Sequence, residues 1–255
     1  MEILMITGTK RKGNSLLAAR YISKKLNADL GILNVVDLKI EPCKACYACL
    51  FGQECMIEDD VKTVFERIKD SDAVLLISPV YWLDLTGKVK MLLDRMFMAL
   101  PYLKEFRDKR GAVVYLYGFE ELRGWASNTY NIFMRVLGIE PLAVVGINAA
   151  LPGEVLRDGN VEKLDMIAEA IQEGKRLRFD HQCPICLSEV FRQENGLLVC
   201  PICRSKLDIN LNVVEEREVM KSEWMDEHYE WLRGMKRLYI EQREELSRLR
   251  DVYGV

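Results

Sequence analysis

The sequence has 255 residues, of which 49% are hydrophobic and 29% charged, and its formal net charge is −3 at pH 7. This composition is typical of a soluble globular protein and excludes a disordered, fibrous or membrane-embedded chain. It gives no reason to expect nucleic acid or an anionic membrane as a partner. The opening residues, MEILMIT, predict a strand and lack the basic region of a signal peptide, so a cytoplasmic protein is expected.

Short apolar runs alternate with amphipathic stretches over residues 1–178, which is the pattern of βαβ units. The predicted strands are Ile3–Thr7, Gly31–Val36, Ala73–Ser78, Ala112–Tyr117 and Leu142–Ile147. The predicted helices are about Ser15–Leu26, Asp60–Lys69, Lys88–Leu100, Ser127–Leu137 and Val161–Gly174. This alternation favours an α/β, flavodoxin-like sheet of five parallel strands in the order 2-1-3-4-5. Ligands of such sheets bind beyond the carboxyl ends of the strands, which selects the loops beginning at Gly8, Pro79 and Gly118.

Two smaller segments complete the predicted organisation. Residues 179–211 are too few to bury a core without a staple, and their four cysteines predict a small metal ribbon. Residues 212–255 predict a long amphipathic helix, because apolar residues recur at steps of three and four from Val213 to Val252. The charges of this helix are mixed and form no basic stripe, so it is expected to pack against a neighbouring subunit or partner.

The loop GTKRKGNS, residues 8–15, lies between the first predicted strand and the first predicted helix. Backbone N–H groups and the helix dipole favour an anion at this position. The spacing resembles the nucleotide P-loop, but Asn14 stands where the phosphate-binding lysine is required, which argues against an NTPase. The alternative is an ordinary turn in which Asn14 or Ser15 caps the helix.

A second loop, Pro79–Leu83, follows a buried strand and places apolar and aromatic side chains at the same edge of the sheet. A flat ring ligand needs such a wall. The alternative is that Tyr81 and Trp82 only cover the end of the sheet. Tyr117 and Gly118 are candidate contacts only because of their position in the expected fold.

The eight cysteines fall into two groups, and the first has the spacing C-x2-C-x2-C-x5-C. Its members are Cys43, Cys46, Cys49 and Cys55. Iron–sulfur clusters commonly take their ligands from such compact runs, whereas zinc sites more often use two separated pairs. The alternative is a structural loop without a cluster. The loop follows the second strand, so it emerges at the same end of the sheet as the two ligand loops, within one subunit or across a dimer interface.

These features together resemble the NADPH-dependent FMN reductase and iron–sulfur flavoprotein families. The resemblance is carried by GTKRKGNS, PCKACYACLFGQECMIEDDV and SPVYWLDLTGKVKMLLDR, which occur in the families' order within residues 1–100. It implies bound FMN, a [4Fe–4S] cluster on the first cysteine group, a homo-oligomer such as a dimer or tetramer, and ferredoxin or NAD(P)H as electron donor. The FMN-binding candidates are Thr9, Arg11, Gly13, Asn14 and Ser15 for the phosphate, and Pro79, Val80, Tyr81, Trp82 and Leu83 for the ring. Our sequence departs from the commonest family form in having a phosphate loop that is one residue shorter, with Lys10 where proline is usual.

The second cysteine group consists of two C-P-I-C knuckles separated by a predicted hairpin. Its members are Cys183, Cys186, Cys200 and Cys203. Four sulfurs from paired turns predict a closed tetrahedral site that supplies most of the folding energy of so small a segment. Zinc is favoured over a single rubredoxin-like iron, because Leu187 and Arg204 replace the glycines usual in rubredoxin knuckles. His181 is a possible competing ligand, but four cysteines already complete the shell.

The sequence therefore predicts a flavin-dependent oxidoreductase that passes electrons between a donor and an acceptor through FMN and a [4Fe–4S] cluster. No catalytic side chain is predicted, because the flavin carries the chemistry. One alternative is a cluster-free NAD(P)H-dependent FMN or quinone reductase. Another is a redox-sensing binding protein that uses its zinc ribbon to recognise a partner.

Overall fold

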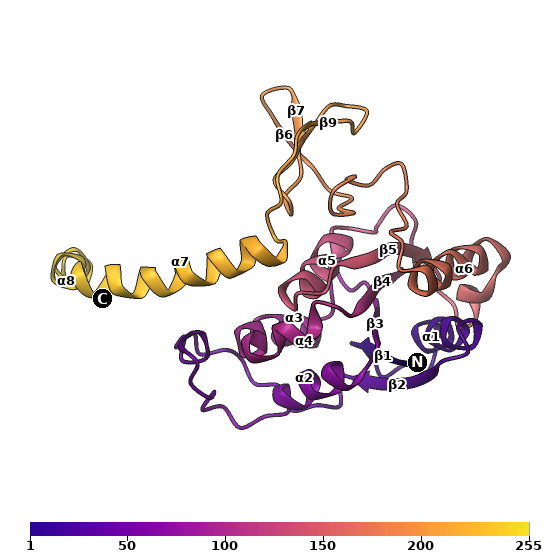
Figure 1. Cartoon of the computed structure of the whole chain (residues 1–255), viewed down its shortest axis with the longest axis horizontal. Helices are drawn as coiled ribbons and strands as arrows, with labels where there is room; N and C mark the ends of the chain where they lie inside the picture. The colour runs from indigo at the N-terminus through magenta and orange to yellow at the C-terminus, as the bar shows by residue number, and fades with distance from the viewer. Residues whose placement is uncertain (255) are drawn as a thin grey trace.

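The computed structural model describes residues 1–254 and has a central parallel sheet of five strands (Figure 1). The strands are β1 (Glu2–Thr7), β2 (Asp29–Asn34), β3 (Ala73–Pro79), β4 (Arg110–Tyr117) and β5 (Pro141–Asn148). They lie in the order β2-β1-β3-β4-β5, and every neighbouring pair is parallel. The predicted flavodoxin-like α/β fold is confirmed.

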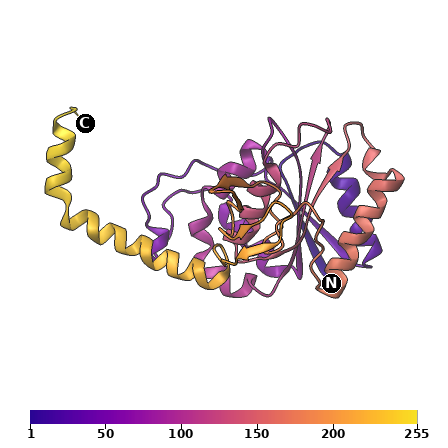
Figure 2. The same cartoon turned by 90° about the horizontal axis from the view of Figure 1, so that it is seen from above.

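Helices cover both faces of this sheet (Figure 2). The helices α1 (Asn14–Lys25) and α6 (Asp158–Glu173) pack on one face. The opposite face is covered by α2 (Val61–Asp70), α3 (Gly87–Leu93), η2 (Met96–Tyr102), α4 (Leu103–Phe106) and α5 (Ala126–Val136). Short 3-10 turns lie at η1 (Cys49–Phe51) and η3 (Glu154–Leu156).

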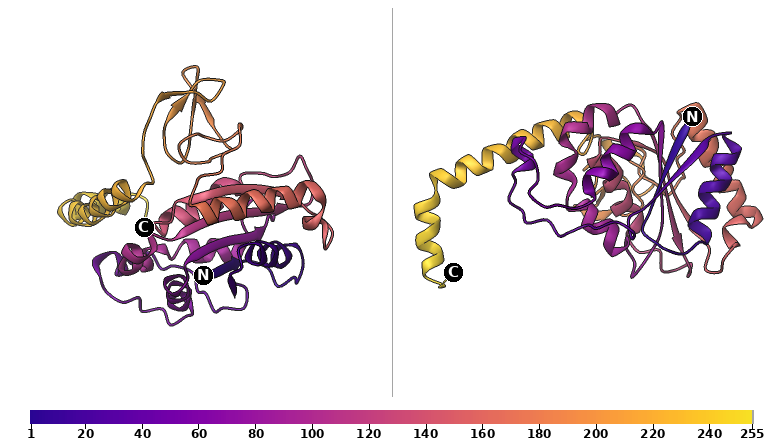
Figure 3. Two further views of the ribbon diagram at one scale, coloured as in Figure 1. Left: turned by 45° about the vertical axis from the view of Figure 1, so that its right-hand side comes forward. Right: turned by 90° about the horizontal axis from the view of Figure 1, so that it is seen from below.

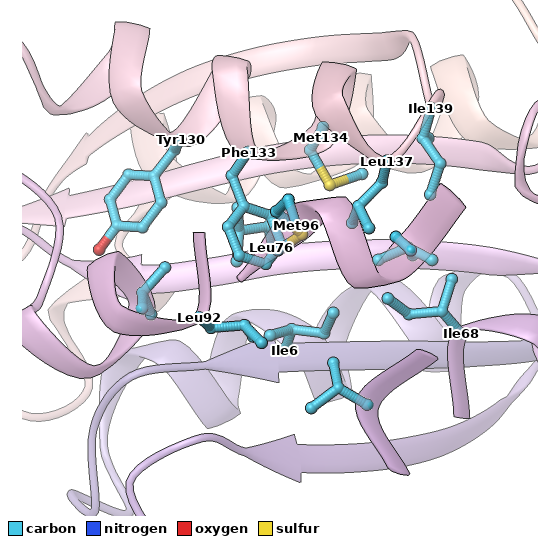
Figure 4. Close-up of a cluster of buried hydrophobic side chains, with 14 of the residues drawn as sticks. Ile6, Ile68, Leu76, Leu92, Met96, Tyr130, Phe133, Met134, Leu137 and Ile139 are labelled. Carbon is cyan, nitrogen blue, oxygen red and sulfur yellow. The ribbon is translucent and has the colours of Figure 1, made fainter. Parts of the chain in front are cut away.

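Alternate side chains of each strand enter opposite cores. In β1, Ile3 and Met5 join the cluster under α1 and α6, whereas Leu4 and Ile6 join the cluster under the other helices. Both cores are apolar because the strands have buried side chains on both faces, as parallel strands usually do. Figure 4 shows the second cluster, in which Phe133 and Met134 of α5 lie over strand residues including Ile6 and Leu76.

The prediction of one continuous helix over Lys88–Leu100 is wrong, because the chain turns at Arg95. The α-helix α3 ends at Leu93, and the 3-10 helix η2 starts at Met96 and contains Pro101. The turn has a clear physical cause: the guanidinium of Arg95 is held by Asp59 and by the carbonyl of Glu41, outside the helix. Proline within η2 also lacks the N–H that a continuous α-helix requires.

The C-terminal part contains a second, antiparallel sheet of four short strands. These are β6 (Arg192–Glu194), β7 (Leu197–Val199), β8 (Lys206–Leu207) and β9 (Val213–Glu215). The prediction that a helix begins near Val213 is wrong, since Val213 pairs with Leu207 in this sheet. A short apolar run fits a strand as well as a helix, and here the ribbon provides a strand partner.

Two helices follow the ribbon, α7 (Ser222–Glu241) and α8 (Arg243–Asp251), and the chain bends between them at Gln242. The first turns of α7 lie on the main body, and α8 is turned away from it (Figure 3). Met225 and Tyr229 of α7 belong to the same buried cluster as the sheet residues, whereas α8 has no buried residue. Within residues 1–254, no helix has the length and apolarity needed to cross a membrane.

Candidate functional site

A cavity of about 520 Å³ opens at the carboxyl ends of the strands, where the fold rule places the ligand. The predicted FMN residues that line it are Thr9, Arg11, Gly13, Asn14, Ser15, Pro79, Val80, Tyr81, Tyr117 and Gly118. Sequence reasoning missed Lys12, Leu116, Ala149, Ala150 and Pro152. Three of these residues follow β5, whose carboxyl end adjoins that of β4. The predicted strand order therefore already indicated that the segment after β5 would line the cavity.

The phosphate loop ends where α1 begins. The first internal bond of α1 runs from Leu17 N–H to Gly13 C=O at 3.0 Å, so the preceding N–H groups lie outside the helical ladder. Thr9 Oγ1 accepts a 3.2 Å hydrogen bond from Arg11 N–H, which holds the loop closed. Backbone donors and the positive end of the helix dipole therefore meet at one end of the cavity, as an anion site requires.

The side chain of Asn14 ties this loop to the segment after β5. Its amide nitrogen donates to the carbonyls of Ala149 and Leu151 at 2.9 Å each, and its amide oxygen accepts from Gly153 N–H at 2.8 Å. These bonds occupy the polar groups of the side chain. Asn14 therefore shapes the cavity as a strut, and only its backbone remains to contact a ligand.

The second loop is a tight turn whose tip points away from the cavity. Tyr81 and Asp84 exchange two backbone hydrogen bonds, and the intervening Trp82 and Leu83 have φ values of 51° and 69°. Trp82 is 99% exposed, and neither it nor Leu83 lines the cavity. These two side chains therefore lie outside the cavity wall that the other predicted residues of this loop form.

Gly124 lies in close contact with this turn. A Cβ atom at Gly124 would lie 2.0 Å from the carbonyl oxygen of Leu83, and its φ of 60° is in the left-handed region that favours glycine. The adjacent Trp125 N–H donates to the same carbonyl at 3.0 Å. The segment after β4 thus holds the loop after β3.

Tyr117 forms part of the cavity wall at the end of β4. Burial raises the pKa of its phenol to about 12, so the hydroxyl stays protonated at neutral pH. The Arg123 guanidinium lies 5.7 Å from the ring centroid, and Glu120 accepts the phenolic hydrogen bond at 3.3 Å. This part of the wall is therefore a protonated phenol ring with a guanidinium and a carboxylate beside it.

The first cysteine group lines a separate cavity of about 370 Å³. All four of its cysteines contribute to the wall, together with apolar side chains of which Met91, Phe97 and Met98 come from the α3–η2 region. Cys43 and Cys46 are exposed, whereas Cys49 and Cys55 are half-buried, and burial raises the pKa of the Cys49 thiol. Four cysteines in the wall of one partly apolar cavity supply the ligand type that an iron–sulfur cluster requires.

The backbone of this loop has an unusual conformation. Ala45 and Tyr47 have φ values of 50° and 59°, which few non-glycine residues adopt. Each left-handed residue lies between two cysteines of the loop, and all of these cysteines line the same cavity. Helix α7 holds the end of the loop, where Arg233 Nε donates to the carbonyl of Leu50 at 2.8 Å.

A buried ion pair lies beside this cavity and was missed by sequence reasoning. The side chains of Arg95 and Asp59 are each only 1% exposed and their charged groups are 2.5 Å apart. Burial by itself raises the pKa of Asp59, but hydrogen bonds from Glu41 N–H and from Arg95 outweigh it, so the pKa lies below its usual range. One feature of the sequence indicated this pair, which was the charged residue Arg95 within a stretch predicted to be an amphipathic helix.

The second cysteine group forms a closed, buried metal site. The sulfurs of Cys183, Cys186, Cys200 and Cys203 all lie within 4.8 Å of one another. The two knuckles repeat the same backbone bonds, from Leu187 N–H to Cys183 C=O and from Arg204 N–H to Cys200 C=O, each 3.0 Å long. Both residues have left-handed backbones, with φ of 64° and 63°. The predicted four-cysteine metal site is confirmed, and His181 is not part of it.

Buried hydrogen bonds attach the ribbon to the main sheet and to α5. Asn131 donates to the carbonyl of Cys186 at 2.7 Å, and Ser188 donates to Asn128 at 2.9 Å. Gln182 donates to the carbonyl of Val144, in β5, at 2.7 Å. Because buried polar groups are costly to leave unpaired, these bonds fix the position of the ribbon on the body.

Comparison with known proteins places this geometry in a family. Residues 1–147 match the family model described as NADPH-dependent FMN reductase. The chain belongs to this family. Among curated proteins, this FMN reductase family member is 31% identical to an iron–sulfur flavoprotein of Archaeoglobus fulgidus, over 68% of our chain and 80% of the relative. It is 27% identical to an iron–sulfur flavoprotein of Methanosarcina thermophila, over 60% and 81%.

A further Archaeoglobus fulgidus iron–sulfur flavoprotein is 38% identical, but the match spans only half of that relative's length and 39% of our chain. Among solved structures, a flavone reductase matches 99% of the family member, with 96% of its own chain, a TM-score of 0.73 and 16% identity. The NAD(P)H:quinone oxidoreductase of Methanothermobacter marburgensis matches 71% of it, with 99% of its own chain, a TM-score of 0.50 and 18% identity. At these identities the two structures establish a shared fold only.

Proposed function

We propose that the protein is an iron–sulfur flavoprotein that transfers electrons between a ferredoxin-like or NAD(P)H donor and an acceptor through FMN and a [4Fe–4S] cluster. The observation that carries this proposal is the common cavity of Cys43, Cys46, Cys49 and Cys55 in a chain of an FMN reductase family. When bound, FMN supplies exchange between two-electron and one-electron chemistry, and the cluster supplies one-electron transfer.

The FMN phosphate would be held by the side chains of Thr9, Arg11 and Ser15 and by the backbone at Gly13 and Asn14. The ring would lie against Pro79, Val80, Tyr81, Tyr117 and Gly118, which line the same cavity. Our proposal leaves out Trp82 and Leu83, which do not line the cavity. The aromatic and apolar wall orients the ring.

The main rival is a cluster-free FMN or quinone reductase in which the first cysteines are structural. Structural cysteines are usually buried and inert, whereas two of these four are exposed and all four line one cavity. Exposed thiols are susceptible to oxidation unless they are bound to a metal or cluster. The arrangement therefore favours a cluster that is kept intact in a reducing cytoplasm.

The C-terminal metal is proposed to be zinc with a structural role. Four buried sulfurs leave no open position for a substrate, as in structural zinc sites. A homo-oligomer is also proposed, with the exposed apolar side chains of α7 and α8, such as Trp231, Ile240 and Leu249, as candidates for a contact with another subunit.

Anaerobic purification followed by metal analysis, flavin extraction and electron paramagnetic resonance (EPR) spectroscopy tests this proposal. The expected content per chain is about one FMN, about four iron atoms in the first group and about one zinc in the second. Reduction with dithionite is expected to produce a cluster signal. Flavin and zinc without iron, or without that signal, would show that the rival reductase is the correct description.

A further inference from the structure

The guanidinium of Arg95 reaches from the α3–η2 turn to the cysteine cavity. One of its terminal nitrogens donates to Cys55 Sγ at 3.4 Å and to Met98 Sδ at 3.1 Å. Its other terminal nitrogen donates to the carbonyl of Glu41 at 2.8 Å and to Asp59 at 2.5 Å, and the first nitrogen also donates to Asp59 at 3.4 Å. Arg95 as a whole is 2% exposed. A long cationic side chain thus joins three separate parts of the chain at the edge of the cavity.

Arg95 and Asp59 differ in how they contact the cavity that contains the four cysteines. Arg95 lines the cavity that contains all four cysteines, whereas Asp59 does not line it. Asp59 lines a neighbouring cavity whose wall also includes Cys49 and Cys55. Arg95 is nevertheless the member of the pair that donates a hydrogen bond to a cysteine sulfur, that of Cys55. Because a buried charge is screened much less than an exposed one, its field acts strongly on any group in that cavity.

Two further charged residues line the cavity, and both are exposed to solvent. Lys44 is exposed, and the side chain of Asp94 is 50% exposed and paired with Lys90. Water and salt weaken the fields of exposed charges. Arg95 is consequently the cation with the strongest effect on the four thiols among the residues that line this cavity.

We propose that Arg95 is a positioning residue that orients Cys55 as a cluster ligand and raises the reduction potential of the cluster, while Asp59 limits this increase. This inference rests on the proposed function. Reduction adds one electron and breaks no protein bond, with ferredoxin, NAD(P)H or, in the test, dithionite as the reductant. A nearby cation stabilises the more negative reduced state more than the oxidised state, and charge near a cluster is a known determinant of its potential.

The test is an EPR-monitored redox titration of the full-length, cluster-loaded protein. The potential is expected to become more negative in Arg95→Gln, which removes the cation, and less negative in Asp59→Asn, which removes its counter-charge. Arg95→Lys keeps the charge but loses the fork of donors, so its potential is expected to lie between wild type and Arg95→Gln. The matched control is Lys104→Gln, an exposed cation of α4 that should leave the potential unchanged.

Opposite shifts in Arg95→Gln and Asp59→Asn support the inference, because a purely structural pair would impair cluster retention in both. Shifts of the same sign, or no shift, overturn it. If Arg95→Gln fails to hold a cluster, unchanged potentials in Arg95→Lys and Asp59→Asn overturn it equally. A wild-type protein that holds no cluster refutes the proposed function itself, whereas a loaded wild type with unshifted variants refutes only the role of Arg95.

Discussion

The two cysteine groups contain the same number of thiols but place them in opposite environments. The second group is buried, and its four sulfurs lie within 4.8 Å of one another, close enough for one ion to contact all of them. The first group lines a cavity of about 370 Å³, and Cys43 and Cys46 are exposed. The four sulfurs of the ribbon are therefore spaced for a single ion, whereas the four cysteines of the first loop line a larger cavity.

The difference shows how each site is held. The ribbon knuckles supply their own repeated backbone bonds, so their geometry is local. The first loop is supported mainly from outside, by Arg95 on one side and by Arg233 of α7 on the other. We therefore expect the closed site of the ribbon to determine whether its segment folds. We expect the first loop, which residues outside it support, to determine only whether a cluster is bound. The predictions below test this contrast.

The largest effect is expected from Cys200→Ser, which removes one ligand of the closed site. Structural zinc contributes on the order of 10 kcal/mol to the folding of small zinc domains, so loss of the metal should unfold the ribbon. The expected result is loss of zinc and a clear drop in thermal stability, measured by metal analysis and calorimetry. Retention of both would contradict a structural role for the site.

Cys43→Ser should have the opposite profile. Loss of a cluster ligand is expected to remove most of the iron, while zinc content, far-UV circular dichroism and thermal unfolding stay close to wild type. The reason is that Cys43 is exposed and contributes no buried packing. A collapse of stability comparable to that of Cys200→Ser would abolish the distinction between the two groups.

Asn14→Ala tests the strut of the FMN cavity. The substitution removes three hydrogen bonds to the segment after β5, two of them partly buried and one exposed. A cost of about 1–3 kcal/mol, expressed as weaker FMN binding, corresponds to a roughly 5- to 150-fold higher dissociation constant. Flavin fluorescence titration measures it, with Lys24→Ala, an exposed residue of α1, as the control. Unchanged affinity would show that the strut does not shape the site.

Arg233→Ala should loosen the first cysteine loop only. It removes the 2.8 Å bond to the carbonyl of Leu50, worth about 1 kcal/mol. Hydrogen exchange is expected to accelerate at residues 49–52, with no change in the ribbon. Arg237→Ala, an exposed neighbour on α7, serves as the control. Equal protection in the variant and wild type would mean that α7 does not support the loop.

The last prediction concerns the pH dependence of stability that Asp59 contributes. Its pKa is lowered in the folded protein, so its carboxylate adds stability above the ordinary aspartate pKa, and this contribution is lost as the pH falls through the folded value. Thermal unfolding measured from neutral to acidic pH should show a steeper loss in wild type than in Asp59→Asn. Parallel curves would show that the carboxylate makes no such contribution.

Several features were accessible from local patterns. Doubly apolar runs such as Ala73–Ser78 predicted buried parallel strands, and the strand order followed from their alternation with helices. Most residues of the cavity at the strand ends followed from the same topology. The turn at Arg95 and the strand at Val213 were not predictable, because each depends on a partner distant in the sequence: Asp59 for the turn and β8 for the strand.

The sequence alone determined the family resemblance, the five-stranded sheet and the division of eight cysteines into two groups, because each rests on spacing within a short segment. Only the tertiary structure decided that Asn14 is a strut, that Trp82 points outward and that Arg95 faces Cys55. The physical reason is the same in all three cases. The direction of a polar or aromatic side chain depends on which acceptors, charges and cavities the rest of the fold brings to it.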